Sequence, residues 1–378
     1  MSIDFTRTDE QELLLESLEE LMKGFPESYW RQCDDERKLP IEWWEAMVDA
    51  GFAFLGIPEE FGGTPIDAVT HMMFNAEVGR LGGPAHLVHN FLRIRDMISF
   101  GTEEQMRYTI EAAKHSPISF ALGASEPQAG SYSKGITAKA VHKEGKVFIS
   151  GHKTFISHAH ATERMLTVTI DDEGKMSMWL VPLNAPGVTM EDVHKVGLKN
   201  SSTCEVYLDN VEVDETDVVG EEGNGLYQLM ENYSYERISI AAQALGMAKC
   251  AYEDAMRYAN QREQFNQPIA NFQLIQQKAL EMYLKIENMQ NLVYKAAWQL
   301  DQGIDDRILP NAAKYYCTRS SFEVIDDAMQ IMGGIGYTDD CRISRLWRDA
   351  RSMRFTGGTD EIMIHVAGRG VLKSFKDR

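Results

Sequence analysis

Five segments of this sequence carry polar side chains or clustered glycines where the regular apolar pattern breaks off, and they hold the best candidates for chemistry. The segments are Ala124–Ser131, Lys153–Ser157, Arg262–Ile269, Gln330–Tyr337 and Phe355–Ile362. They offer hydroxyl, amide, carboxylate and guanidinium groups, which can orient a ligand or move a proton. Each has a plain structural explanation when taken singly, because a glycine-rich break after a helix is usually a C-cap.

Several common catalytic and cofactor motifs are absent from the sequence. It contains no GxxxxGK[ST] phosphate loop, no GxSxG nucleophile turn and no HExxH metal motif. The run Gly333–Gly336 follows an apolar helical pattern rather than a strand, which excludes a Rossmann dinucleotide site. His158 and His160 form an H-x-H pair, but no cluster of acids or cysteines stands near them in the sequence. We therefore expect loop histidines rather than metal ligands.

Composition excludes several classes of partner. The 378 residues are 44% hydrophobic and 25% charged, as expected for a globular chain with a large core. A net charge of −19 argues against binding to nucleic acid or to an anionic membrane surface. Five scattered cysteines favour a reducing compartment. The N-terminus lacks a leader pattern and no apolar run approaches the ~20 residues of a membrane span, so we expect a cytoplasmic protein.

The elements that must position the candidate residues change in type twice along the chain. Residues 1–118 have a helical pattern, with Thr8 and Gln11 spaced as a capping box and an amphipathic run at Pro40–Ala50. Residues 119–226 have a β pattern, and residues 227–378 are helical again. The sequence therefore predicts three domains with these bounds and a multidomain α+β fold.

The middle region contains two hairpin signals and further short strands, which favour a small barrel or sandwich. The expected strands are Thr137–His142, Val147–Ser150, Met165–Ile170, Met176–Leu183, Ser202–Leu208 and Val211–Val213. In the last region Ile238–Gln261, Phe272–Gln299 and Asn311–Met332 are each long enough for a major helix of a bundle.

In this order and setting, the five segments resemble the motifs of the acyl-CoA dehydrogenase family over essentially the whole chain. The runs Tyr258–Arg262 and Arg345–Asp349 most resemble the bacterial branch that contains crotonobetainyl-CoA reductase. The resemblance implies an N-terminal helical domain, a middle β-barrel or sandwich and a C-terminal four-helix bundle. It also implies FAD as cofactor, a homotetramer, and electron exchange with an electron-transferring flavoprotein in fatty acid metabolism.

The resemblance assigns cofactor roles residue by residue, with FAD extended between the β domain and the bundle. Leu122, Ala124 and Ser125 would face the isoalloxazine, Phe155 would pack on the ring, and Ser157 would bond near N5. The more distant contacts, several of them across a subunit interface, would come from Ser131, Arg262, Gln264, Phe265, Gln330, Gly334, Thr359 and Glu361. Arginine suits the pyrophosphate because its planar fork matches phosphate oxygens.

The catalytic base departs from the commonest family pattern. Many members carry a glutamate where this chain has Gly357, whereas a second subgroup takes the base from the start of the first long bundle helix. There the chain has Glu236, which we expect to remove the α-proton, while the Gly357 N–H polarises the thioester oxygen. Substrate contacts are expected from Ser131, Tyr233, Tyr235 and Arg237.

Two further departures lie in the first motif, where Gln128 replaces a glycine and Tyr132 replaces an acid near the CoA entrance. Gln128 limits positive φ at its position. The resemblance implies an acyl-CoA or an enoyl-CoA as substrate, and the sequence leaves the direction of the reaction open. The alternatives to dehydrogenation are an enoyl-CoA reductase of the crotonobetainyl-CoA type and a non-enzymatic FAD- or CoA-binding scaffold; an acyl-CoA oxidase fits less well.

Overall fold

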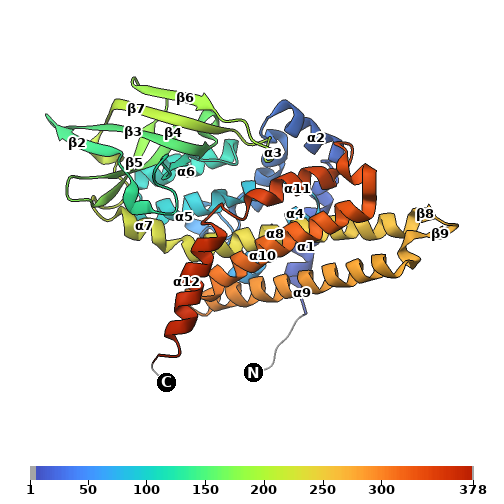
Figure 1. Cartoon of the computed structure of the whole chain (residues 1–378). Coiled ribbons are helices and arrows are strands. Elements are labelled where there is room, and N and C mark those ends of the chain that lie inside the picture. The colour runs from blue at the N-terminus through green and yellow to red at the C-terminus, as the bar shows by residue number, and fades with distance from the viewer. Residues whose placement is uncertain (1–5, 377–378) are drawn as a thin grey trace. The chain divides into compact units, whose positions relative to one another are not determined.

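The computed structural model describes residues 6–376, which fold into two compact units (Figure 1). The helical unit combines the chain up to Gln32 with Pro65–Val88 and everything from Ser234 onward. The sheet unit combines Cys33–Thr64 with His89–Tyr233. Helices from the start of the chain therefore belong to the same unit as helices from its end.

The N-terminal third consists of short helices, and the expected capping box is present at the first of them. Helix α1 spans Asp9–Met22, and the Thr8 hydroxyl accepts from the Gln11 N–H while the Gln11 side chain accepts from the Thr8 N–H. The predicted run at Pro40–Ala50 is helix α3. The helices after α1 are α2 (Glu27–Glu36), α3 (Ile41–Asp49), α4 (Ala68–Arg80), α5 (Asn90–Phe100) and α6 (Glu103–His115).

One seven-stranded sheet dominates the sheet unit, in the order β1-β4-β2-β3-β7-β6 with β5 also paired to β4. Buried side chains cover both of its faces, because successive strand residues point to opposite sides. The strands are β1 (Ala121–Gly123), β2 (Lys139–Lys143), β3 (Lys146–Ser157), β4 (Arg164–Ile170), β5 (Met176–Pro182), β6 (Val188–Asp192) and β7 (Thr203–Val213).

The sequence predicted two strands where the structure has β7 alone, and that prediction is wrong. The polar pair Asp209-Asn210 has the composition of a turn, but it forms a bulge opposite β3. The register passes from Ile149↔Val211 to Gly151↔Leu208, and Asn210 takes a φ of 51°. Asparagine tolerates this left-handed conformation, so the strand bends without ending.

Three long helices form the core of the helical unit at the predicted places: α8 (Tyr233–Gln261), α9 (Gln273–Asp301) and α10 (Leu309–Met332). Helix α10 contacts α9, α11 (Arg342–Ser352) and α12 (Asp360–Lys373). Helix α8 approaches α4 backbone to backbone, since a Cβ on Gly246 would lie 3.0 Å from the Gly79 Cα. A short helix, α7 (Gly225–Glu231), precedes α8 within the sheet unit.

A short β-hairpin with a two-residue turn joins the C-terminal end of α8 to the N-terminal end of α9 (Figure 1). Its strands are β8 (Glu263–Gln264) and β9 (Gln267–Pro268), and Phe265 and Asn266 between them have φ values of 52° and 61°. Positive φ at both positions is the signature of a type I′ turn. Across residues 6–376, every helix is too short or too polar to cross a membrane.

Candidate active site

A bulge in β3 exposes the aromatic residue of the second motif. The β3–β7 register shifts between Lys153 and Ile156, and Phe155 within the shift has a φ of 55°. Its side chain is 67% exposed. A non-glycine residue at positive φ is strained, and bulges of this kind re-aim a side chain near functional sites. Leu122 on β1 is also exposed, so the sheet unit presents two apolar side chains at the positions predicted to face a flavin.

The first and second motifs are joined beneath this surface by a buried ion pair. Lys153 Nζ donates to Glu126 Oε1 over 2.7 Å and to the Val168 carbonyl over 2.6 Å, and both charged side chains are buried. The Thr154 N–H donates to the Ser125 carbonyl over 3.0 Å. Removing one charge would leave the other buried and unpaired, so this pair fixes how the two motifs lie against each other.

The pair affects the titration of both its members. Burial acts to raise the pKa of Glu126, but the hydrogen bond and charge of Lys153 outweigh it and hold that pKa below its usual range. Burial lowers the pKa of Lys153 against the opposing effect of Glu126. The pair is a structural anchor of the first motif, since Glu126 also accepts from the backbone N–H groups of Thr137 and Ala138.

The structure accounts for Gln128, one of the two departures in the first motif. Its side-chain amide donates to Glu126 Oε2 over 2.6 Å and to the Thr137 hydroxyl over 2.9 Å. Gln128 thus adds another donor to the buried carboxylate, and its own φ is not positive. Ser131 and Tyr132 lie at exposed positions after it, and nothing in their contacts explains the tyrosine.

The helical unit brings the two predicted catalytic residues together. Glu236 stands in the first turn of α8, and Gly357 lies in the turn between α11 and α12 with a φ of 64°. A Cβ on Gly357 would lie 3.6 Å from Glu236 Oε1 and 2.5 Å from Ile240 Cδ1. The space that a side chain at 357 would use is therefore taken by α8, and the Glu236 carboxylate reaches the turn instead.

Two cations hold the carbonyls of this turn. Arg237 Nε donates to the Gly357 carbonyl over 3.4 Å, and Lys314 Nζ on α10 donates to the Gly358 carbonyl over 2.6 Å. Burial lowers the pKa of Lys314 to about 8, against the raising effect of Asp360. With both carbonyls engaged by cations, the turn is fixed from two helices. Lys314 was not predicted, although a lysine amid the apolar pattern of Asn311–Met332 is a signal that could have identified it.

The two tyrosines expected near the acyl group differ in their surroundings. Tyr235 is buried, and its hydroxyl oxygen lies 2.6 Å from Nδ1 of His71 on α4. Its polar end is thus engaged by a neighbouring helix. Tyr233 begins α8 and is partly exposed.

The remaining predicted FAD residues lie on the surface of the helical unit. Phe265 at the tip of the β8–β9 hairpin is 87% exposed, and Arg262 and Gln264 beside it are exposed as well. Gln330 at the end of α10 and Gly334 just after it are also exposed.

The start of α12 has a local explanation. The Thr359 hydroxyl accepts from the Ile362 N–H over 3.3 Å and so caps the helix. The Glu361 carboxylate accepts from its own backbone N–H and from the Thr359 hydroxyl. Both hydrogen bonds lower the pKa of Glu361. A helix N-terminus also favours anions, so the cap is compatible with the predicted ligand contact without requiring it.

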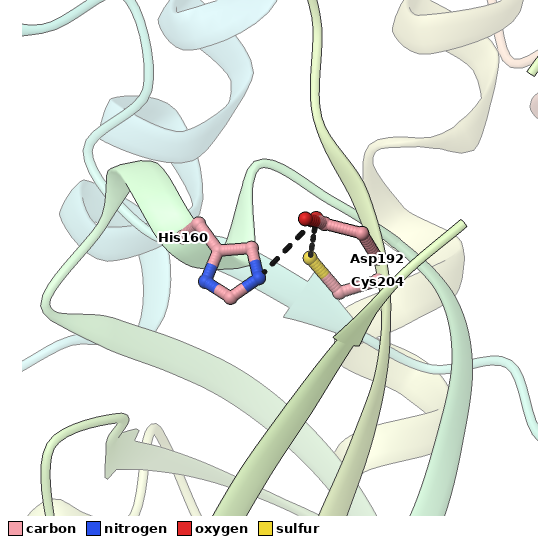
Figure 2. A group of neighbouring side chains, drawn as sticks. All are labelled: His160, Asp192 and Cys204. Carbon is pink, nitrogen blue, oxygen red and sulfur yellow. Dashed lines mark hydrogen bonds and ion pairs between the residues drawn. The ribbon is translucent and has the colours of Figure 1, made fainter. Parts of the chain in front are cut away.

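The sequence showed no acid or cysteine cluster beside the H-x-H pair, but the fold supplies one for His160. His160 Nε2 lies 3.3 Å from Asp192 Oδ1, and Cys204 Sγ lies 4.0 Å from the same oxygen (Figure 2). His160 lies in the turn Ala159–Ala161, as expected of a loop histidine, and the fold brings Asp192 and Cys204 close to it. His158 is buried instead, with Nε2 2.9 Å from the Ser201 hydroxyl.

Comparisons with known proteins agree along the whole chain. The family models described as the N-terminal, middle and C-terminal domains of acyl-CoA dehydrogenase match residues 8–113, 121–211 and 223–372. The chain is 48% identical over 383 residues to "Probable acyl-CoA dehydrogenase YdiO" of Escherichia coli K12, and 100% of both sequences is covered.

Two solved structures are similar over nearly their full length. Butyryl-CoA dehydrogenase from Megasphaera elsdenii matches with a TM-score of 0.90 and 28% identity, covering 98% of this chain and 100% of that one. A chain from work on the electron transferring flavoprotein of Acidaminococcus fermentans matches with a TM-score of 0.90, 29% identity and the same coverage. These matches confirm the predicted fold class.

Proposed function

The chain belongs to the acyl-CoA dehydrogenase family of oxidoreductases acting on the CH–CH group, and from that premise we propose that it uses FAD to oxidise the Cα–Cβ bond of an acyl-CoA thioester. The observation that carries the proposal is the approach of Glu236 to the Gly357 turn. A base and a hydrogen-bond donor side by side are what α-proton removal from a thioester requires.

In this proposal Glu236 takes the α-proton on its carboxylate. The Gly357 N–H donates to the thioester oxygen and stabilises the negative charge that develops there. Arg237 and Lys314 hold the two turn carbonyls, which keeps the peptide planes of the turn in one orientation. FAD supplies the acceptor for the β-hydrogen, which leaves as hydride.

The side chains of the sheet unit fit a flavin. Phe155 and Leu122 offer exposed apolar surface, and a flat ring system packs well on such groups. Ala124 and Ser125 would face the isoalloxazine with Leu122, and Ser157 would hydrogen-bond near N5. The Glu126–Lys153 ion pair joins the first and second motifs within the protein itself, so their arrangement does not depend on a bound flavin.

We place the rest of the cofactor on the helical unit of a second subunit. The exposed Phe265, with Arg262 and Gln264 beside it, would meet the pyrophosphate and adenosine across an interface. Gln330 and Gly334 of that subunit would add to these contacts, and Ser131, Thr359 and Glu361 would supply the remaining ones. An oligomer then follows, because one chain cannot complete its own site, and the family resemblance favours a homotetramer. The electron partner would be an electron-transferring flavoprotein, which the work on the A. fermentans neighbour also names.

The proposal is tested by an anaerobic titration of the purified, yellow protein with a panel of acyl-CoA thioesters. Bleaching of the flavin by a saturated acyl-CoA is the expected result. If the reduced protein is instead re-oxidised by an enoyl-CoA faster than the oxidised protein is bleached, the enzyme is a reductase of the crotonobetainyl-CoA type. A flavin that responds to no thioester in either state would contradict the enzyme and favour a scaffold.

A further inference from the structure

We propose that His160, Asp192 and Cys204 form a binding site for one divalent zinc-class metal ion on the sheet unit. The His160 nitrogen, an Asp192 oxygen and the Cys204 sulfur all lie within 4.8 Å of one another (Figure 2). They supply one nitrogen, one oxygen and one sulfur donor, and these are the three ligand types that zinc takes in proteins.

The distances are close to those of a tetrahedral site. With metal bonds of about 2.0 Å to nitrogen and oxygen and about 2.3 Å to sulfur, two nitrogen or oxygen ligands stand about 3.3 Å apart and sulfur about 3.5 Å from oxygen. The observed separations are 3.3 Å between His160 Nε2 and Asp192 Oδ1 and 4.0 Å between Cys204 Sγ and that oxygen. The third pair, the His160 nitrogen and the Cys204 sulfur, lies within 4.8 Å, so the three donors would have to draw together slightly around the metal.

The backbone holds two of the donors in fixed register. Asp192, the last residue of β6, is the direct antiparallel partner of Cys204 on β7. Directly opposed residues carry their side chains on the same face, with Cβ atoms about 5 Å apart. Cys204 also pairs with Ile156 of β3 on its other side, so it lies within the sheet.

His160 comes from the turn that follows β3. The turn Ala159–Ala161 is short, and the residue before it, His158, has a φ of 64° and donates its N–H to the Ser202 carbonyl over 2.9 Å. That bond keeps the turn beside the start of β7. Sites built on strands and tight turns keep their ligands close to the binding geometry before the metal arrives.

The donor set selects the metal class. A thiolate with an imidazole suits Zn²⁺ and its borderline neighbours, whereas Ca²⁺ and Mg²⁺ require mostly oxygen ligands. His160 and Asp192 are exposed and Cys204 is buried, so the metal would have protein ligands on one side and water in its fourth position. Binding breaks the Cys204 S–H bond, forms a sulfur–metal bond and releases the proton to solvent.

The charges around the site are compatible with a dication. A thiolate and a carboxylate neutralise the two positive charges of the metal. Lys195 lies close enough for its charge to favour the Cys204 thiolate, and its ammonium donates to the Ser201 carbonyl and, over 2.8 Å, to the Thr203 hydroxyl. Thr203 also pairs with Ser157 at the end of β3. A bound metal would thus join the turn after β3 to β6 and β7.

The test uses the untagged, full-length, FAD-loaded protein after treatment with a chelator. Zn²⁺ is titrated in competition with a chromophoric chelator, and Co²⁺ is used as a spectroscopic probe at wavelengths beyond the flavin absorption. We expect one ion per chain, ligand-field bands of a four-coordinate Co²⁺ site, and release of one proton. Cys204→Ser, Asp192→Asn and His160→Gln should each weaken binding at least about tenfold, since loss of even outer-shell partners costs that much.

His142→Gln is the matched control, because His142 Nε2 also pairs with a carboxylate, that of Glu222 at 3.0 Å, on the surface of the same unit. It should leave metal binding unchanged. If Cys204→Ser fails to fold, the two exposed ligand variants still decide the question. Zn²⁺ that binds equally well to wild type and to the ligand variants, or no stoichiometric binding to wild type, would overturn the site.

Discussion

Glu236 and Gly357 depend on each other, because the carboxylate of one lies where the other has no side chain. Replacing Glu236 with Gln keeps the size of the side chain and removes its basicity. We expect turnover to fall by at least about a hundredfold, the usual contribution of a general base. Exchange of the α-proton of a bound acyl-CoA with D₂O, followed by NMR, should be lost with it, whereas the FAD content should stay at the wild-type value.

Glu281→Gln, an exposed position on α9, is the matched control and should be silent. If the Glu236→Gln protein exchanges the α-proton at the wild-type rate, Glu236 is not the base. Loss of FAD together with activity would point to a structural role for Glu236.

Residues that act through long-range contacts were the hardest to predict. The family resemblance pointed to Glu236 and Gly357 as expected catalytic residues because both lie in short, recognisable motifs. The proximity of Asp192 and Cys204 to His160 was not predicted, because only the β6–β7 register brings these residues together. Lys314 was missed for the same reason, since its partner is the Gly358 carbonyl in a turn far along the chain.

Helix α10 fixes the turn between α11 and α12 through Lys314, and this contact predicts a dependence of stability on pH. Burial of the ammonium lowers the folded-state pKa of Lys314 to about 8, from the ordinary lysine value of 10.5. Between these values the unfolded chain binds more protons than the folded one, so this residue makes stability rise with pH in that window. Below pH 8 the cost of burying the charge is fully present.

Urea denaturation of wild type and Lys314→Met from pH 7 to pH 10.5 would measure this effect. We expect the free energy of unfolding of the wild type to gain on that of the variant above pH 8, by at most about 3 kcal/mol over the window. A constant difference across the range would show that Lys314 titrates normally. At neutral pH the variant should also lower turnover, because the Gly358 carbonyl loses its donor.

At the scale of elements, the sequence identified the long helices best. The patterns of α8, α9 and α10 extend over many turns, so their periodicity is unambiguous. The short strands β1 and β6 were not predicted, and β7 was divided at Asp209-Asn210. A polar pair in a bulge has the same composition as a turn, and only its pairing with β3 distinguishes the two.

At the scale of the whole molecule, the compact units do not follow the order of the chain. Helices α1 and α4 belong with α8 to α12, and the Gly79–Gly246 approach shows how closely α4 and α8 pack. Such a contact between distant segments leaves little trace in composition, because glycine inside a helical pattern has several explanations. The shifts between helical and strand patterns along the sequence predicted the types of element correctly. They could not show that early and late helices share one unit.

Phe265 tests the proposed assembly, because its ring is 87% exposed in the single chain and packs edge-on against Phe272 alone among the described aromatic contacts. Asparagine is favoured at positive φ, so Phe265→Asn keeps the type I′ turn and removes only the ring. If this ring meets FAD across a subunit interface, the variant should lose FAD and shift from tetramer towards smaller species, as measured by light scattering and flavin absorbance. Its monomer fold should stay intact by circular dichroism.

Tyr132→Asn, which removes a ring that is 65% exposed on the sheet unit, should change neither the FAD content nor the oligomeric state. A Phe265→Asn protein that stays tetrameric with full FAD occupancy would remove the hairpin from the cofactor site and leave the interface to other surfaces of the helical unit.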